Sequence, residues 1–183
     1  MVAPHVVAPH MGTPLGGDGL GGEARVGAYR LIKRLAVGGM GEVFLAAQET
    51  PYFTRYVALK RALPHLARER DFVERLIDEA KVMSGLHHGN IIHVHELKQD
   101  EWGLYIVMEY LPGADLRWLN QQLKRRGERW PPELAVWVIH EACLGLEYAH
   151  QARDEQGEPL HLIHRDLSPS NILLGREGEV KLI

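Results

Sequence analysis

The stretch from Leu160 to Leu174, LHLIHRDLSPSNILL, contains two polar side chains whose types and spacing could do chemistry. Asp166 follows an apolar approach, and Asn171 comes five positions later, before a second apolar run. A carboxylate can accept a proton from a hydroxyl nucleophile, and an amide oxygen can bind a hard cation such as Mg²⁺. The pattern predicts a turn that carries an acid and an amide between two short buried strands.

A buried pair of opposite charges is expected earlier in the chain. Lys60 lies near the end of an apolar strand predicted from Arg55 to Ala62, and Glu79 lies at the edge of the apolar arc of a helix predicted from Arg70 to Leu86. An inward-pointing carboxylate needs a cationic partner, because burying it unpaired costs several kcal/mol. Lys60 is the favoured partner, and Arg75, four residues earlier on the same helix, is the alternative.

Three glycines lie in the short segment Gly38-Gly39-Met40-Gly41. This segment joins two predicted strands, Tyr29 to Val37 and Glu42 to Gln48. Glycines in such a hairpin let backbone N–H groups approach a ligand closely. A plain tight turn would explain the segment equally well if it stood alone.

The elements that must position these residues fall into two parts of the chain. The first part has five predicted strands with one helix after the third, and its last two strands, Ile92 to Leu97 and Leu104 to Tyr110, form a hairpin. Pro112-Gly113 marks the boundary. Two helices follow, Asp115 to Arg125 and Pro131 to His150. The second is apolar almost all round, so we expect it to be central.

Composition excludes several classes of protein. The chain has 183 residues, 45% hydrophobic and 25% charged, which is typical of globular domains, and its net charge of −3 does not indicate a nucleic-acid or membrane-surface partner. The longest apolar run, Leu134 to Ile139, is six residues and too short for a membrane span. The one cysteine, Cys143, excludes an internal disulfide and is expected to be buried and inert. A reducing cytoplasm is the simplest compartment.

The N-terminal segment Met1 to Gly27 is predicted to be disordered. It contains seven glycines and three prolines and has almost no apolar periodicity, so it cannot bury enough surface to offset its chain entropy. It does not resemble a secretory signal, because no lysine or arginine precedes Arg25 and the prolines interrupt any apolar core.

Together, these motifs resemble those of the protein kinase family in both order and spacing. Leu35 to Phe44, LAVGGMGEVF, is similar to the glycine-rich loop, and Val57 to Lys60, VALK, is similar to the third-strand lysine motif. His164 to Asn171 matches the catalytic-loop pattern H-R-D-x-x-x-x-N. The sequence Gly-Gly-Met-Gly-Glu-Val is most similar to the corresponding loop of bacterial serine/threonine kinases of the eukaryotic type.

The resemblance implies an α+β fold. Residues 28–111 would form an N-lobe, a five-stranded antiparallel sheet with one helix, called helix C in the family. Residues 112–183 would be the truncated start of a helical C-lobe, through the catalytic loop. The implied function is ATP-dependent phosphorylation of serine and threonine hydroxyls in a protein substrate.

The resemblance also implies a role for each candidate residue. Lys60 would hold the α- and β-phosphates of ATP and pair with Glu79, while Asp166 would be the catalytic base and Asn171 a Mg²⁺ ligand. Asp115 would reach the ribose. The other implied ATP contacts are the glycine-rich loop, the residues above and below the adenine ring, the gatekeeper and the hinge: Ala36, Val37, Gly38, Gly39, Met40, Gly41, Val43, Ala58, Leu173, Met108, Glu109 and Leu111.

Three departures from the family pattern bear on activity. Ala36 stands where the first glycine of the loop is usual, which is tolerable if its φ is negative. Ser168 stands where serine/threonine kinases carry a lysine that neutralises the γ-phosphate. The sequence ends at Ile183, and in the family the Asp-Phe-Gly motif, whose aspartate holds the principal Mg²⁺, would come next.

Two other functions compete with an active protein kinase. The first is a nucleotide-binding or scaffold module that acts through contacts alone, a pseudokinase by truncation. The second is a small-molecule kinase on a related fold. Arg165 weighs against the second, because in protein kinases the matching arginine contacts a phosphorylated activation loop.

We expect the 183-residue chain, expressed by itself, to lack phosphotransferase activity and to be poorly soluble. The family's metal-binding aspartate would lie beyond Ile183, and the helix Pro131 to His150 would expose apolar surface. A radiolabelled phosphate-transfer assay with a protein substrate tests the first expectation, and robust transfer by this chain would contradict it.

Overall fold

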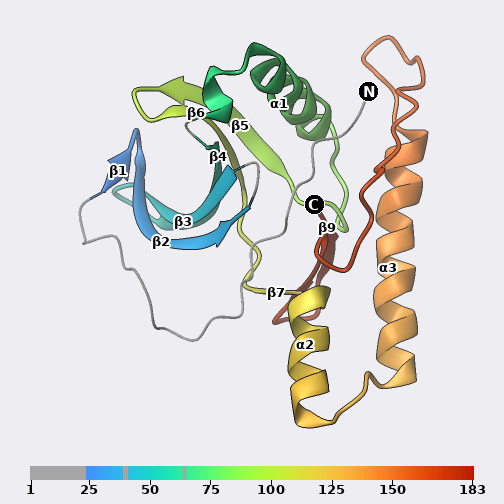
Figure 1. The fold of residues 1–183 in the computed structure, drawn as a ribbon. Coiled ribbons are helices and arrows are strands. Elements are labelled where there is room, and N and C mark those ends of the chain that lie inside the picture. The colour runs from blue at the N-terminus through green and yellow to red at the C-terminus, as the bar shows by residue number, and fades with distance from the viewer. Residues whose placement is uncertain (1–23, 39–40, 64) are drawn as a thin grey trace.

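A computed structural model describes residues 24–38, 41–63 and 65–183. Its first half is a curled antiparallel sheet with one helix against it, and its second half contains two helices and a small sheet (Figure 1). The large sheet has six strands in the order β1-β2-β3-β4-β6-β5. Their bounds are β1 Arg25–Val26, β2 Tyr29–Val37, β3 Gly41–Glu49, β4 Thr54–Ala62, β5 Val94–Asp100 and β6 Gly103–Glu109.

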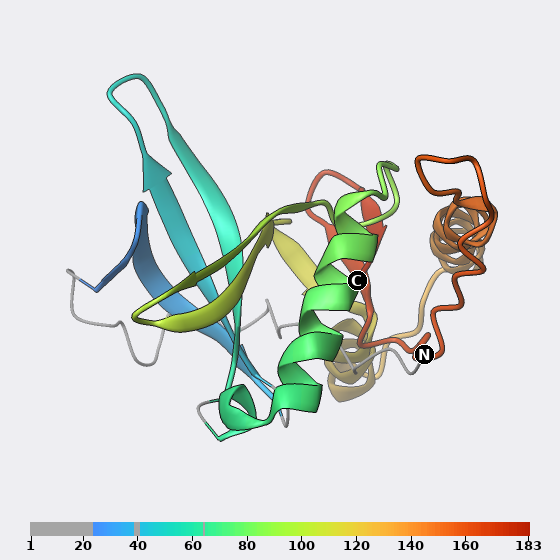
Figure 2. The same ribbon diagram turned by 90° about the horizontal axis from the view of Figure 1, so that it is seen from above.

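The small sheet has three strands in the order β7-β8-β9. They are β7 Gly113–Asp115, β8 Ile172–Gly175 and β9 Val180–Leu182. The helices are α1 Arg70–Ser84, preceded by a 3₁₀ turn at Leu66–Arg68, then α2 Leu116–Arg126 and α3 Pro132–Gln151. In Figure 2, α2 and α3 are seen nearly end-on and α1 lengthwise, so α1 runs across the direction of both. The predicted α+β arrangement and the order of its elements are confirmed.

The prediction of five strands in the large sheet missed β1. The segment Met1 to Gly27 was predicted to be disordered, and this was wrong for its described end, residues 24–27. Val26 pairs with Tyr29, and both side chains are almost completely buried, at 3% and 0% exposure. They belong to an apolar cluster on the outer face of the sheet that includes Phe44 and Leu59. This burial offsets the entropy of ordering the strand. Residues 1–23 of the predicted disordered segment lie outside the described residues.

Helix α1 covers the inner face of the large sheet. Phe72, Leu76 and Ala80 are buried in a cluster that also contains Ile92, just before β5, and Ile106 of β6. The predicted apolar arc of the helix is therefore confirmed. The opposite side is exposed, as predicted, and it carries Glu74, Asp78 and Lys81.

The loop after α1 is fastened to the second half of the molecule through Asn90. The side-chain amide of Asn90 donates to Glu141 Oε2 of α3 at 2.8 Å and to the carbonyl of Val180 at 2.9 Å. Its own carbonyl accepts from the N–H of Leu182 at 2.8 Å. Gly145 of α3 faces this loop, and a Cβ there would lie 2.9 Å from the Asn90 carbonyl oxygen. The close approach of helix and loop therefore requires glycine at this position.

Helix α3 packs against β9 on one side and exposes apolar side chains on another. Val138 and Ala142 are buried, whereas Val136 and Ile139 are 70% and 54% exposed. This exposure confirms the expectation that the helix exposes apolar surface. It does not agree with the expectation of a central helix, because the helix is not enclosed on all sides. Cys143 is exposed, so the prediction of a buried thiol was wrong. The apolar composition of α3 did not reveal which of its faces is covered.

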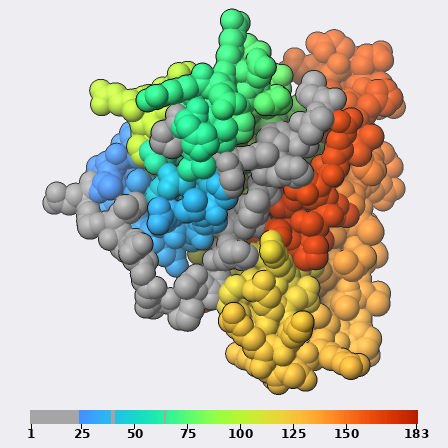
Figure 3. All heavy atoms as spheres, in the orientation of Figure 1, coloured from blue at the N-terminus to red at the C-terminus, as the bar shows by residue number. Residues whose placement is uncertain are grey.

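Figure 3 shows how the chain after α3 lies on the surface. The orange-red segment that follows the helix lies along the orange surface of α3, above the yellow surface of α2. The cavity described below is lined by residues of this segment, of α3 and of α1.

Replacing Gly145 with alanine tests the close contact between α3 and the Asn90 loop. Helix propensity alone predicts stabilisation by about 1 kcal/mol, whereas overpacking costs about 1–3 kcal/mol. Because the nearest neighbour is a backbone carbonyl that cannot move aside cheaply, we expect net destabilisation, measured as a lower midpoint of urea unfolding. The exposed Cys143→Ala change in the same helix is the control and should alter stability by less than about 0.5 kcal/mol. A more stable Gly145→Ala variant would contradict the expectation.

Candidate active site

The predicted pair of opposite charges joins the large sheet to α1. Lys60 Nζ, from β4, lies 3.7 Å from Glu79 Oε1 of α1, and each side chain is only 11% exposed. Lys60 points to the α1 side of the sheet, as do its neighbours Ala58 and Ala62. Among the described ion pairs, Glu79 pairs with Lys60 and not with the alternative partner, Arg75.

Burial dominates the electrostatics of this pair. Desolvation lowers the pKa of Lys60, and the attraction of Glu79 offsets that shift only in part. Desolvation likewise raises the pKa of Glu79 above its ordinary value of 4.5, against the attraction of Lys60 and of His164. Glu79 Oε2 is buried and has no hydrogen-bond partner among the described residues. The pair can therefore accept a further polar ligand.

The turn that carries Asp166 has an unusual backbone. Arg165 has a φ of 59°, in the left-handed region that non-glycine residues rarely adopt, and the N–H of Asp166 donates to the carbonyl of His164 at 2.8 Å. Such a three-residue turn is rare and strained. Strain of this kind, worth about 1–3 kcal/mol, is found mostly where function requires it.

Asp166 and Asn171 are brought together as predicted. The Asn171 side-chain nitrogen donates to the main-chain oxygen of Asp166 and to its Oδ2, both at 2.8 Å. These two bonds fix the orientation of the amide. Asn171 is 1% exposed, and its Oδ1 is buried with no hydrogen-bond partner in the described part of the chain. An amide oxygen left in this state is suited to bind a hard cation.

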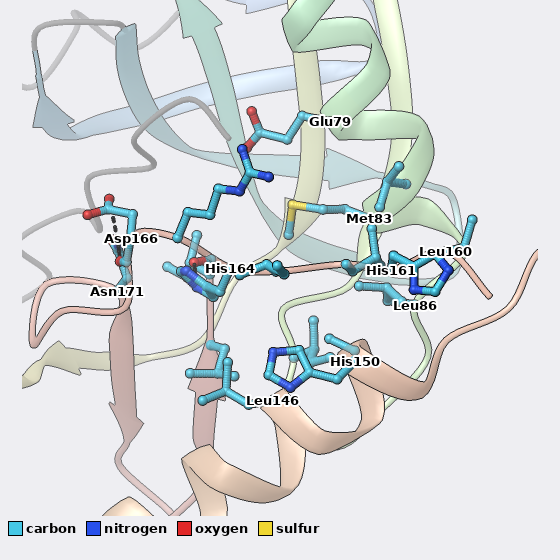
Figure 4. A pocket seen from close by; sticks show the side chains of 18 of the residues that line it. Glu79, Met83, Leu86, Leu146, His150, Leu160, His161, His164, Asp166 and Asn171 are labelled. Atoms are coloured by element: carbon cyan, nitrogen blue, oxygen red, sulfur yellow. Dashed lines mark hydrogen bonds between the residues drawn. The ribbon is translucent and has the colours of Figure 1, made fainter. Parts of the chain in front are cut away.

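Only one of the two predicted strands around this turn forms. Asn171 leads directly into β8, whereas residues 160–164 have no regular structure and Ile163 is 63% exposed. The apolar residues of this approach line a cavity of about 420 Å³ instead of pairing in a sheet. Figure 4 shows Glu79 entering the cavity from α1, and Asp166 and Asn171 together at one side.

Five of the predicted ATP contacts, from the faces of the adenine ring, the gatekeeper position and the hinge, lie in one apolar cluster. They come from β3, β4, β6, the segment after β6, and β8, and each is 5% exposed or less: Val43, Ala58, Met108, Leu111 and Leu173. The cluster links the large sheet to the small one, because Leu173 belongs to β8. Glu109, the first hinge residue, ends β6.

The predicted glycine-rich loop is described only at its two ends. Ala36 and Val37 belong to β2, and Ala36 is not among the described residues with positive φ, so its methyl group is tolerated as predicted. The N–H of Gly38 donates to the carbonyl of Gly41 at 2.8 Å, which closes the hairpin. Gly39 and Met40 lie outside the described residues.

Asp115 lies at the predicted position but has a structural contact. It is completely buried, and its Oδ1 accepts from the N–H of Trp118 at 2.7 Å, which caps α2. Its contact with a ribose stays a prediction.

The family model for the protein kinase domain matches residues 29–183, most of the chain. The chain belongs to the protein kinase family. Among curated relatives, it is 42% identical over 158 residues to the tyrosine-protein kinase MasK of Myxococcus xanthus, which covers 86% of this chain and 24% of MasK. It is 40% identical over 148 residues to the serine/threonine-protein kinase PknJ of Mycobacterium tuberculosis, which covers 81% of this chain and 23% of PknJ.

Solved kinase structures show the same fold. The crystal structure of the Mycobacterium tuberculosis PknI kinase domain matches with a TM-score of 0.68 at 28% identity, over 89% of this chain and 60% of that chain. The present chain therefore spans about a quarter of the length of MasK and of PknJ, and it matches only part of the PknI kinase domain.

Two polar contacts in this kinase site were not predicted. His164 Nε2 lies 3.0 Å from the carbonyl oxygen of Ile183, and Lys181 Nζ lies 3.1 Å from Glu109 Oε1. The sequence did contain a signal for the second contact, because Lys181 is a charged residue inside the apolar run Val180 to Ile183. The same reasoning that assigned a partner to Glu79 would have applied to it.

The ionisation of Glu79 can be tested by removing its partner. Because burial raises the pKa of Glu79, the folded state holds this proton more tightly than the unfolded state does, so stability falls as pH rises above the ordinary pKa of 4.5. In a Lys60→Met variant the carboxyl group of Glu79 has no cation beside it. The fall of the free energy of unfolding with rising pH should then reach about 1.4 kcal/mol per pH unit.

Urea unfolding at several pH values between about 5 and 7.5 measures the effect. The matched control is the double variant Lys60→Met/Glu79→Gln, which has no ionisable group at the pair and should lack this component of the pH dependence. Parallel pH profiles for the two variants would show that Glu79 is not desolvated as described.

Proposed function

We propose that this chain is the ATP-binding and catalytic-loop part of a serine/threonine protein kinase. The observation that carries the proposal is the fixed amide of Asn171, whose two N–H groups bind Asp166 and whose Oδ1 stays available. Residues 28–111 would form its N-lobe and residues 112–183 the start of its C-lobe. Its relative PknJ is named as a serine/threonine-protein kinase, which supports this choice.

The residues of the chain would divide the work of binding and proton transfer. Lys60, held by Glu79, would bind the α- and β-phosphates of ATP, whose negative charge favours the protonated lysine. The apolar cluster would enclose the adenine ring, with the hinge backbone beside it. Asp166 would orient the substrate hydroxyl and accept its proton as the γ-phosphate is transferred in line.

Asn171 fits the role of a Mg²⁺ ligand. Its buried oxygen has no hydrogen-bond partner among the described residues, and the two bonds from its nitrogen prevent the amide from turning over. When bound, Mg²⁺ would supply positive charge to the phosphates. The reaction uses ATP, so we place the domain in the cytoplasm. Within the described ranges, the helices are too short or too polar to cross a bilayer.

Tyrosine is the second candidate acceptor. Ser168 replaces the lysine of serine/threonine kinases, and the Myxococcus xanthus relative MasK is named as a tyrosine-protein kinase. The carbonyl of Ser168 accepts from the N–H of Asn171 at 2.9 Å, so the residue helps to shape the turn even though its side chain cannot supply a charge. Pro169, which follows, is closer to the serine/threonine pattern.

Phosphate transfer by the product of the complete gene tests the proposal. With radiolabelled ATP and Mg²⁺, we expect autophosphorylation that a Lys60→Met change abolishes and an Asp166→Asn change lowers by about 10²- to 10⁴-fold. Phosphoamino-acid analysis then separates serine and threonine from tyrosine.

The exposed Lys81→Met change is the control and should leave the rate unchanged, because Lys81 lies on the solvent side of α1. Binding of ATP without any transfer would favour the scaffold function instead. Undiminished activity of the Lys60→Met variant would contradict the assigned roles.

A further inference from the structure

Glu109, at the end of β6, is held through its main chain and through both of its carboxylate oxygens. Its N–H donates to the carbonyl of His93 at 2.8 Å, and its Oε2 accepts from the N–H of His93 at 3.2 Å. Its Oε1 lies 3.1 Å from Lys181 Nζ. A residue restrained at three points has little freedom, so the start of the hinge segment is fixed in place.

Lys181 reaches Glu109 from the small sheet. It lies in β9 directly opposite Leu173 of β8, and its side chain is only 13% exposed. Side chains that lie opposite each other in an antiparallel pair stand on the same face of the sheet. The stem of Lys181 therefore stands beside Leu173, and its ammonium group extends to the hinge.

The strand that carries Lys181 is itself anchored. The N–H of Leu182 donates to the Asn90 carbonyl, and the Leu182 carbonyl accepts from the N–H of Ile92, each at 2.8 Å. The N–H of Ile183 donates to the carbonyl of Asn171 at 3.1 Å. Lys181 is thus part of the same unit as the catalytic turn, and its contact with Glu109 ties that unit to the hinge.

Among the described ion pairs, the cation next to Glu109 is Lys181 and not a histidine. The rings of His93 and His95 lie 5.0 Å apart between centroids. Burial lowers the pKa of His95, with further lowering by Arg55 and His93, while Glu109 and Glu96 oppose the shift in part. Burial therefore favours the neutral form of His95, and the ammonium group within 4 Å of Glu109 belongs to Lys181.

We propose that Lys181 is a positioning residue for the adenine base of ATP. By holding Glu109, it fixes the hinge backbone at residues 109–111, which would lie beside the base, relative to Leu173, which would lie against one face of the base. This inference rests on the proposed function. Lys181 acts on the base end of the nucleotide, whereas Lys60, Asp166 and Asn171 act on the phosphate end.

The two ends of the nucleotide can be measured separately. Isothermal titration of the complete gene product, in the presence of Mg²⁺, gives dissociation constants for ADP, adenosine and inorganic tripolyphosphate. In a Lys181→Met variant, we expect the constants for ADP and adenosine to rise by the same factor, on the order of tenfold, with tripolyphosphate unchanged. Lys181→Arg should retain most of the affinity, because a guanidinium group also pairs with a carboxylate.

Lys98→Met is the matched control for the loss of a lysine. Lys98 Nζ lies 3.1 Å from Glu96 Oε2 in β5, so this change also removes an ion pair but not one at the hinge. It should leave all three constants unchanged. If Lys181→Met fails to fold, as judged by circular dichroism, Glu109→Gln replaces it, because glutamine keeps the acceptor for the N–H of His93 and loses the charge.

The outcomes separate the inference from the proposed function. Equal adenosine affinity in the wild type and the Lys181→Met variant overturns the inference and leaves the kinase proposal intact. Equal losses for adenosine and tripolyphosphate show a general structural role and also overturn it. A wild-type protein that binds no adenine compound overturns both.

Discussion

The attachment of the loop after α1 to β9 and α3 is the constraint on which the site depends. Asn90 makes this attachment with its side-chain amide and its carbonyl, and Gly145 allows α3 to come close enough. The loop follows the helix that carries Glu79, and β9 follows the turn that carries Asp166. A shift at Asn90 would therefore move the Lys60–Glu79 pair relative to Asp166 and Asn171. The proposed phosphate binding and proton transfer would need both pairs at one place.

Much of the site was predictable because its charged residues interrupt apolar patterns. Glu79 lies at the edge of an apolar arc, so its need for a cation could be inferred before any fold was known, and the structure shows Lys60 beside it. The predicted bounds of the five strands of the large sheet and of the three helices agree with the structure to within a few residues, because hydrophobic periodicity is strong in these segments. The turn at Asp166 was predictable from its spacing to Asn171.

The remaining features depend on contacts that local sequence does not contain. Strand β1 is two residues long, and its stability comes from the burial of Val26 against distant side chains. The apolar run before His164 had the composition of a strand but pairs with no strand among the described residues. Exposure of Cys143 depends on which side of α3 is covered. Asp115 was predicted both to start a helix and to reach a ligand; its cap on α2 agrees with the first prediction, whereas its complete burial could be found only from the fold.

The Lys60–Glu79 pair has a consequence for folding as well as for chemistry. Both faces of β4 are apolar at its centre: Ala58 and Ala62 pack on the α1 side, whereas Val57 and Leu59 pack in the cluster on the outer side. Hydrophobicity alone therefore gives this strand little reason to prefer one register over a slip by one residue, which would exchange its faces. Such a slip would carry the lysine into the outer apolar cluster and leave Glu79 without a cation under α1. The Lys60–Glu79 ion pair therefore favours the observed register of β4 over the slipped one.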